Sequence, residues 1–252
     1  MSDRRRTYFN NNSIKFPLIV EYTKSGTYNI PSGATSASVF IVGGGGGGAG
    51  DGSTFRNCGG GGNGGVVKTF NSVSLGSSTK ITVTIGAGGA GGSHYSNEYS
   101  NAGDGGSSSV KIGSKTYSAQ GGSKGIMVYA LYYGDGDYGE RGRGIGQYGA
   151  LEQLAASDGI ACSFLNNGKK YGAGGGSGGH YGDAELEILS SYAAGETGGG
   201  EGGTGRYGLN NSTNAGKAAT FYGSGGGGAA FHSMHNQSGG KGYQGIVIIK
   251  YE

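Results

Sequence analysis

The sequence has little of what most folded domains use. Of its 252 residues only 2 are proline, 2 are cysteine and none is tryptophan. Scarce proline and no strict three-residue glycine period exclude collagen. Cys58 and Cys162 lie too far apart in sequence to suggest a secreted disulfide scaffold, so reduced structural thiols are favoured. The chain also lacks a signal-like apolar segment and the roughly 18 apolar residues of a membrane span, which predicts synthesis in the cytoplasm and no membrane insertion.

What the chain has in abundance is glycine, with 63 residues, while hydrophobic residues make up 34%. The apolar core should therefore be small for the mass of the chain. Ordering a residue's backbone costs roughly 1–2 kcal/mol, and glycine is at the expensive end. We therefore expect dense backbone hydrogen bonding or a partner chain, and the deficit of core favours an oligomer.

The glycines occur in blocks, at residues 43–48, 59–62 and 225–228, beside apolar stretches such as residues 39–42 and 246–249. The extended helix with three residues per turn is the candidate conformation, and it has no internal hydrogen bonds. Every N–H and C=O then needs an outside partner, which neighbouring glycine helices can supply at backbone distance. Flexible linkers are the alternative for these blocks.

The remaining pattern is mainly β. In residues 81–85 isoleucine and valine alternate with threonine, which is typical of a half-buried strand. We expect residues 66–73 and 80–85 to form a strand pair, and Gly113-Ser114 to turn a short hairpin between 110–112 and 115–117. Further strands are expected at residues 18–22, 27–30, 36–42 and 246–251.

Two short helices are expected in the middle of the chain, at residues 184–194 after an Asp183 cap and at residues 150–157. The predicted fold is a small β-sandwich-like core with packed, polyglycine II-like segments and one or two short helices. We expect one domain over residues 16–252, with a tyrosine- and glycine-rich insertion at 126–165.

Residues 1–15 form a polar arm without a core of its own. The net charge of +3 is concentrated there, and a nucleic-acid binder would show a broader basic face. The arm combines charge with aromatic area, which favours ordering on a partner surface, while a mobile solubilising tail is the alternative. The predicted anchoring residues are Arg4, Arg5, Arg6, Tyr8 and Phe9.

No motif carries convincing chemistry. Residues 86–91 (GAGGAG) fit the dinucleotide fingerprint, but no helical pattern follows to receive a pyrophosphate. His232 and His235 could approach one metal ion, and an acidic loop could bind calcium, but solvated loops are favoured in both cases. That acidic loop contains Asp135, Asp137 and Glu140. No Ser/His/Asp or Cys/His constellation is evident. We expect no catalysis, no cofactor and no metal site.

Tyrosines are the best candidates for recognition, because each offers a rigid aromatic face and a hydroxyl group at low entropic cost. The alternative is that they cover the glycine surface. The predicted receptor-contact residues are Tyr129, Tyr132, Tyr133, Tyr138 and Tyr148.

Several motifs in order resemble the glycine-rich domains of bacteriophage tail-fibre and related virion proteins. They are SGTYNIPSGAT at residues 25–35, VFIV and six glycines at 39–48, ITVTIGAGG at 81–89, and GIVIIKY at 245–251. The resemblance implies a homotrimeric virion fibre, of tail or head, in which a β part supports glycine segments and variable loops. The expected partners are other virion proteins through the arm and a host-surface glycan or protein. An ice-binding or cell-surface glycine-rich protein is the alternative.

Overall fold

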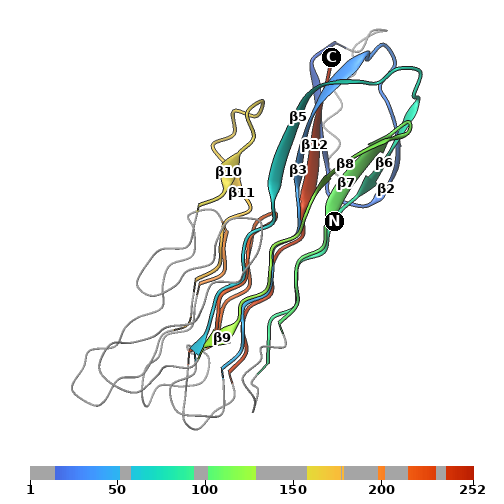
Figure 1. Cartoon of the computed structure of the whole chain (residues 1–252). Coiled ribbons are helices and arrows are strands. Elements are labelled where there is room, and N and C mark those ends of the chain that lie inside the picture. Colours follow the sequence, from blue (N-terminus) through green and yellow to red (C-terminus); the bar gives the residue numbers. More distant parts are fainter. Residues whose placement is uncertain are drawn as a thin grey trace, which may run out of the picture.

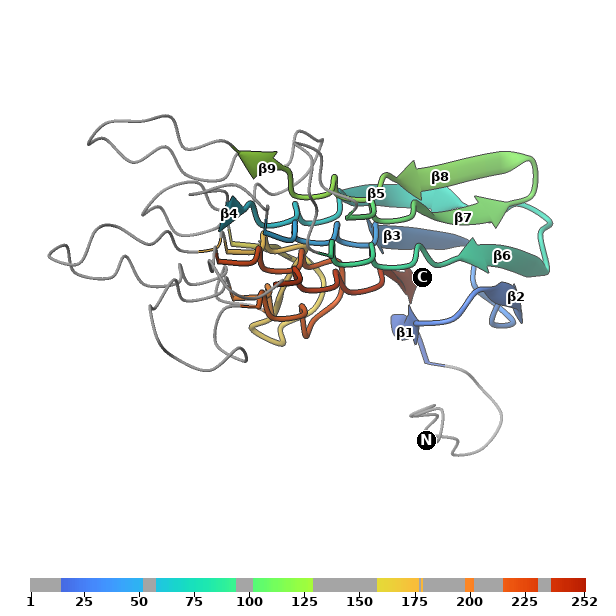
Figure 2. The same cartoon turned by 90° about the horizontal axis from the view of Figure 1, so that it is seen from below.

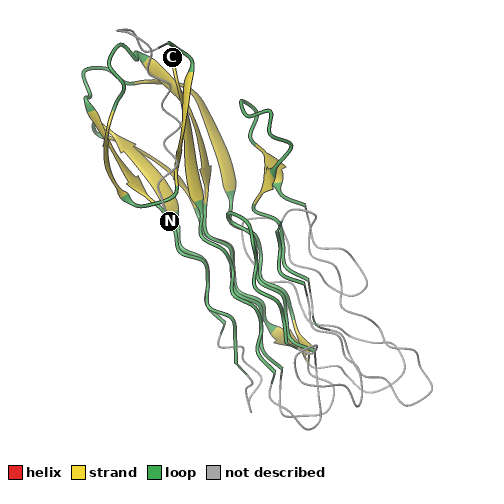
Figure 3. Ribbon diagram, turned by 180° about the vertical axis from the view of Figure 1, so that it is seen from behind, coloured by secondary structure: helices red, strands yellow, loops and turns green. Residues whose placement is uncertain are grey.

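The computed structural model describes residues 15–51, 58–93, 102–128, 158–176, 178, 198–201, 215–230 and 237–252. They form an elongated molecule with a β-sandwich at one end and a bundle of extended, glycine-rich segments at the other (Figure 1). Strands gather at the sandwich end, and the described residues include no helix (Figure 3). The mainly β fold predicted from the sequence is confirmed, whereas the helices expected at 150–157 and 184–194 lie outside the described residues.

The sandwich consists of two four-stranded antiparallel sheets. The first has the order β1 (Leu18–Tyr22), β12 (Ile246–Tyr251), β3 (Ser36–Val42) and β5 (Val67–Ser74). The second has the order β2 (Gly26–Asn29), β6 (Lys80–Thr84), β7 (Ser108–Ile112) and β8 (Lys115–Ala119). Two short pairs join β4 (Cys58–Gly59) to β9 (Met127–Val128), and β10 (Ile160–Ala161) to β11 (Lys170–Tyr171).

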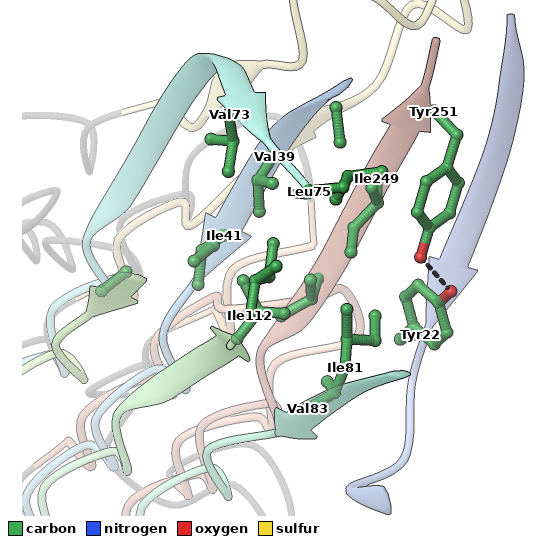
Figure 4. Close-up of a cluster of buried hydrophobic side chains, with 14 of the residues drawn as sticks. Tyr22, Val39, Ile41, Val73, Leu75, Ile81, Val83, Ile112, Ile249 and Tyr251 are labelled. Atoms are coloured by element: carbon green, nitrogen blue, oxygen red, sulfur yellow. Dashed lines mark hydrogen bonds between the residues drawn. The ribbon is translucent and has the colours of Figure 1, made fainter. Parts of the chain in front are cut away.

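The main core lies between the two sheets and is made of alternate residues of their strands (Figure 4). In β6 the side chains of Ile81 and Val83 are buried while Thr82 and Thr84 are exposed, so the predicted half-buried strand is confirmed. The hydroxyl groups of Tyr22 and Tyr251 form a buried hydrogen bond of 2.8 Å at one edge of this core.

The first sheet is covered on its other face as well. Phe40, Val42, Ile246 and Ile248 form a second cluster there, together with Cys162 and Tyr171 of the segment that carries β10 and β11. Strands buried on both faces read as continuous apolar runs. This explains why residues 39–42 and 246–249 contain no polar residue.

One strand pairing predicted from the sequence is wrong. The strands at residues 66–73 and 80–85 exist, but β5 pairs with β3 in the first sheet and β6 pairs with β2 and β7 in the second. The turn between them, closed by the hydrogen bond from Ser78 to Leu75, therefore carries the chain from one sheet to the other. The hairpin around Gly113 is confirmed, with Ile112 opposite Lys115 and a positive φ of 58° at the glycine.

Strands of the sandwich continue directly into the extended segments. Residues 43–51 follow β3, residues 86–93 follow β6 and residues 120–126 follow β8, whereas other segments lead into β5, β7 and β12. Figure 2 shows these segments running side by side away from the sandwich. The strands of the sandwich thus fix where each of these segments enters the bundle.

Candidate functional site: a glycine lattice and its far end

Within the described residues, ten extended segments make up the bundle, and we number them as lines I to X in chain order. They comprise residues 43–51, 59–66, 86–93, 102–107, 120–126, 172–176, 198–201, 215–220, 223–230 and 237–245. They contain almost no regular strand pairing, yet backbone hydrogen bonds connect each line to its neighbours.

Line I donates hydrogen bonds in three directions with a period of three residues. Gly43 and Gly46 donate to line II, Gly44 and Gly47 to line IV, and Gly45 to line X, over 2.9–3.0 Å. Its carbonyl groups accept hydrogen bonds from lines III, V and IX. Six neighbours therefore enclose line I. The three-residue period is that of the polyglycine II helix, so this predicted conformation is confirmed.

Line IX is the second enclosed line. It donates to lines I, VI, VIII and X, and it accepts from Gly62 of line II and Gly200 of line VII. The connections define three layers, with lines V, II and VI in one, IV, I, IX and VII in the middle, and III, X and VIII in the third. The blocks at residues 43–48 and 225–228 are thus the interior of a lattice rather than linkers.

Glycine is required in the enclosed lines for space. A Cβ atom on Gly43, Gly46 or Gly47 would stand 2.5 Å from a carbonyl carbon of lines V or III and overlap the oxygen. Residues 43–48 have no positive φ, so no left-handed conformation demands glycine there. The core of this half of the molecule is made of backbone.

The lattice predicts a specific pattern of amide hydrogen exchange. The amides of Gly46, Gly47 and Gly226 are buried and hydrogen-bonded, and we expect them to exchange slowly. Ala87 and Ala90 of line III are exposed and their N–H groups donate to no backbone carbonyl of the described residues, so we expect fast exchange there. Residue-resolved NMR exchange tests this contrast, and equally fast exchange at all five amides would show a flexible bundle.

The far end of the lattice is where the described lines stop. Asp51, at the end of line I, is fully buried; its N–H donates to the carbonyl of Gln237 at the start of line X, and its carboxylate accepts the N–H of Gln237. At the same end, antiparallel pairing of β4 with β9 joins lines II and V. Among the described residues, Asp51, Ser93, Val128 and Ala230 are the last before a gap at this end.

All the residues predicted to act in recognition fall outside the described residues. This holds for the anchoring residues Arg4, Arg5, Arg6, Tyr8 and Phe9, and for the tyrosines Tyr129, Tyr132, Tyr133, Tyr138 and Tyr148. It holds also for His232, His235, Asp135, Asp137 and Glu140. In the part of the chain that is described, no three histidine, cysteine or acidic side chains gather where they could hold a metal ion.

Two other sequence interpretations can be compared with the described chain. The fingerprint-like residues 86–91 are part of line III and contact lines IV and X, with an extended backbone through residue 93 where a nucleotide site needs a helix N-terminus. Cys162 is a buried free thiol beside the sandwich, and burial raises its pKa, which agrees with the structural role predicted for it.

A row of aromatic rings joins the sandwich to the lattice, and sequence reasoning missed it. Phe40 packs against Tyr171, then Phe221, Tyr222 and finally Tyr243, with ring centroids 5.1–5.5 Å apart. Phe221 and Tyr222 precede Gly223, whose φ of 74° turns the chain from line VIII into line IX. An aromatic pair directly before a glycine block was the available signal. Tyr243 is 37% exposed, so the row reaches the surface.

The match to known families agrees with this geometry. Residues 22–252 match the model of a family described as a glycine-rich domain, which spans both the sandwich and the lattice. The chain belongs to this glycine-rich domain family. No curated protein matches the sequence. In the described parts of this glycine-rich domain, no helix has the length and apolar character needed to cross a membrane.

Proposed function

We propose that this glycine-rich domain protein is a non-catalytic structural protein of a bacteriophage virion, a tail or head fibre that attaches to the host surface. The observation that supports this most is the division of the molecule into two ends. The sandwich carries both the strand that follows the arm and the strand at residues 246–251, while lines I, III and V run away from it and the described chain along each ends at the opposite end, at Asp51, Ser93 and Val128. A nine-residue polyglycine II line extends about 28 Å, so the lattice separates the two ends.

The far end is the proposed receptor-binding end. The candidate tyrosines lie in segment 129–157, which begins directly after Val128 of β9. Replacing Tyr132 and Tyr133 by alanine should lower binding of the labelled protein to host cells at least tenfold if they contact the receptor. The matched control is Tyr117→Ala in the sandwich, which packs against Phe70 and should leave cell binding unchanged in folded protein. Equal binding by the far-end variant and the wild type would contradict this assignment.

The arm is the proposed anchor to other virion proteins. Deletion of residues 1–12 removes no described strand, because β1 begins at Leu18. We therefore expect the truncated protein to fold and keep its oligomeric state but to be missing from particles, as measured by mass spectrometry of purified virions. Incorporation of the truncated protein at the normal level would show that another surface of the protein attaches it to the virion.

We retain a homotrimer as part of the proposal, on the strength of the resemblance to fibre proteins. Lines I and IX are enclosed by other lines of the same chain, so the shortage of apolar core does not by itself require partner chains. Light scattering should give three times the chain mass of 25.0 kDa. A stable folded monomer would remove the trimer from the proposal.

The ice-binding alternative expects regularly spaced small or hydroxyl-bearing side chains on a flat face. Line III does carry exposed small or hydroxyl-bearing residues at every third position, namely Ala87, Ala90 and Ser93. In line X beside it, however, the corresponding positions hold Ser238, Lys241 and Gln244, so long polar side chains interrupt the face. We therefore favour the virion proposal.

A further inference from the structure

Two outer lines of the lattice, III and X, carry an outward-pointing side chain at every third residue. In line X, a Cβ atom on Gly239 or Gly242 would overlap line I, and one on Gly240 would overlap line VIII. The remaining third of the positions points away from these lines. Those positions hold Ser238 and Lys241, which are exposed, and the partly exposed Gln244.

Line III, which lies beside line X, has the same period. Gly89 faces line IV, and Gly88 and Gly91 face line X. The third positions are Ala87, Ala90 and Ser93, all exposed. The interior lines differ in that residues 43–48 and 225–228 are all glycine, since each of their three faces meets a neighbouring line.

Where lines III and X lie side by side, backbone N–H and C=O groups face outward as if a further neighbouring line were missing. We call this strip of surface the furrow. The N–H groups of Gly88 and Gly91 donate to no backbone carbonyl, and the carbonyl groups of Gly239 and Gly242 accept from no backbone N–H, within the described chain. All four glycines are partly exposed. Donors on one wall and acceptors on the other are what an additional polyglycine line would need.

We infer that the Cβ atoms of Ser238 and Lys241 block this furrow, so that it cannot take up an extended glycine-rich line of a second copy of the chain. Every copy carries such lines, so each is a potential partner for every other. A lattice neighbour approaches so closely that one Cβ atom on the facing position overlaps its carbonyl group, as the interior glycines show. The outer lines therefore face the problem of edge strands in sheets, which proteins protect with charged residues, lysine above all. Here the Cβ atom does the blocking, and the charge of Lys241 adds to it.

The test removes the Cβ atoms. Wild type, S238G/K241G and S238A/K241A are compared by sedimentation velocity from micromolar to near-millimolar concentration. We expect the glycine variant to associate reversibly and at least double its mass, whereas the alanine variant keeps the wild-type mass. The alanine variant loses the same charge and hydroxyl group but retains both Cβ atoms, so it separates blocking from charge.

Folding is checked through slow exchange of the Gly46 amide, which lies in the enclosed line I. A folded glycine variant with the wild-type mass at every concentration would overturn the inference, as would equal association of the alanine variant. If the double variant does not fold, K241G alone is tested against K241A with the same two criteria. A synthetic peptide with the sequence of residues 86–93 serves as a second probe. It should bind the glycine variant only, and equal binding to all three proteins would also overturn the inference.

Discussion

Alanine at Gly47 is expected to cost this protein a large part of its stability. The added Cβ atom would stand 2.5 Å from the carbonyl carbon of Ala90 and overlap its oxygen, in a line enclosed by six others. Overpacking a core costs about 1–3 kcal/mol when side chains can adjust, and here only backbone surrounds the methyl group. We expect a loss of at least about 3 kcal/mol, against the 5–15 kcal/mol typical of whole domains. Urea unfolding gives the value.

The matched control is Gly103→Ala, which contacts the same residue. Its Cβ atom would lie 3.0 Å from the nitrogen of Ala90, on the partly exposed line IV. Neither Gly47 nor Gly103 has a positive φ, so alanine suits both backbones and even reduces the entropy of the unfolded chain. We expect a change within about 1 kcal/mol for the control. Similar losses at the two sites would show that the lattice is not packed at backbone distance.

The buried tyrosine pair is expected to make the protein sensitive to alkali. Burial raises the pKa of Tyr22 and, more strongly, that of Tyr251, whose pKa also rises through its hydrogen bond to Tyr22. Below about pH 10 both phenols are neutral in the folded and the unfolded chain, and stability is fully present. Above that pH the unfolded chain releases protons that the folded chain retains. Stability then falls by about 1.4 kcal/mol per pH unit for each tyrosine until the folded pKa is reached.

Phenylalanine variants show how much of the loss of stability at alkaline pH comes from this tyrosine pair. Y22F or Y251F alone leaves the remaining hydroxyl group buried without its partner, and we expect each to lose about 1–3 kcal/mol at neutral pH. The double variant should lose less than the sum, and its stability should fall less steeply above pH 10. Urea unfolding from pH 7 to 11 measures both effects. An unchanged alkaline slope in Y22F/Y251F would contradict the assignment.

The sequence predicted the elements of this fold better than their arrangement. Residues 36–42 and 246–251 were recognised as strands, because β-branched runs bounded by glycine are a strong local signal. The pairing of residues 66–73 with 80–85 failed, because a short turn looks the same whether it joins neighbours in one sheet or crosses between two.

The glycine lattice illustrates the same limit more strongly. Its conformation could be predicted from blocks of glycine. The neighbours of each line could not, because glycine has no side chain whose size or polarity would reflect its contacts. The outward positions are the exception: GAGGAGGS in line III has a small side chain at every third residue, which marks an outer line. For the candidate site, the sequence pointed to tyrosines beyond the described residues and missed the row that includes Tyr171, Phe221 and Tyr243.

The last strand of the chain lies in the middle of the first sheet, between β1 and β3, and this sets the order of events during synthesis. Until residues 246–251 have left the ribosome, β1 has no partner in this sheet and β3 can pair only with β5, and line X reaches its place beside line I equally late. Contacts so distant in sequence make folding slow. A chain truncated before Ile246 lacks β12 altogether, so we expect such truncated chains to form no soluble, assembled protein.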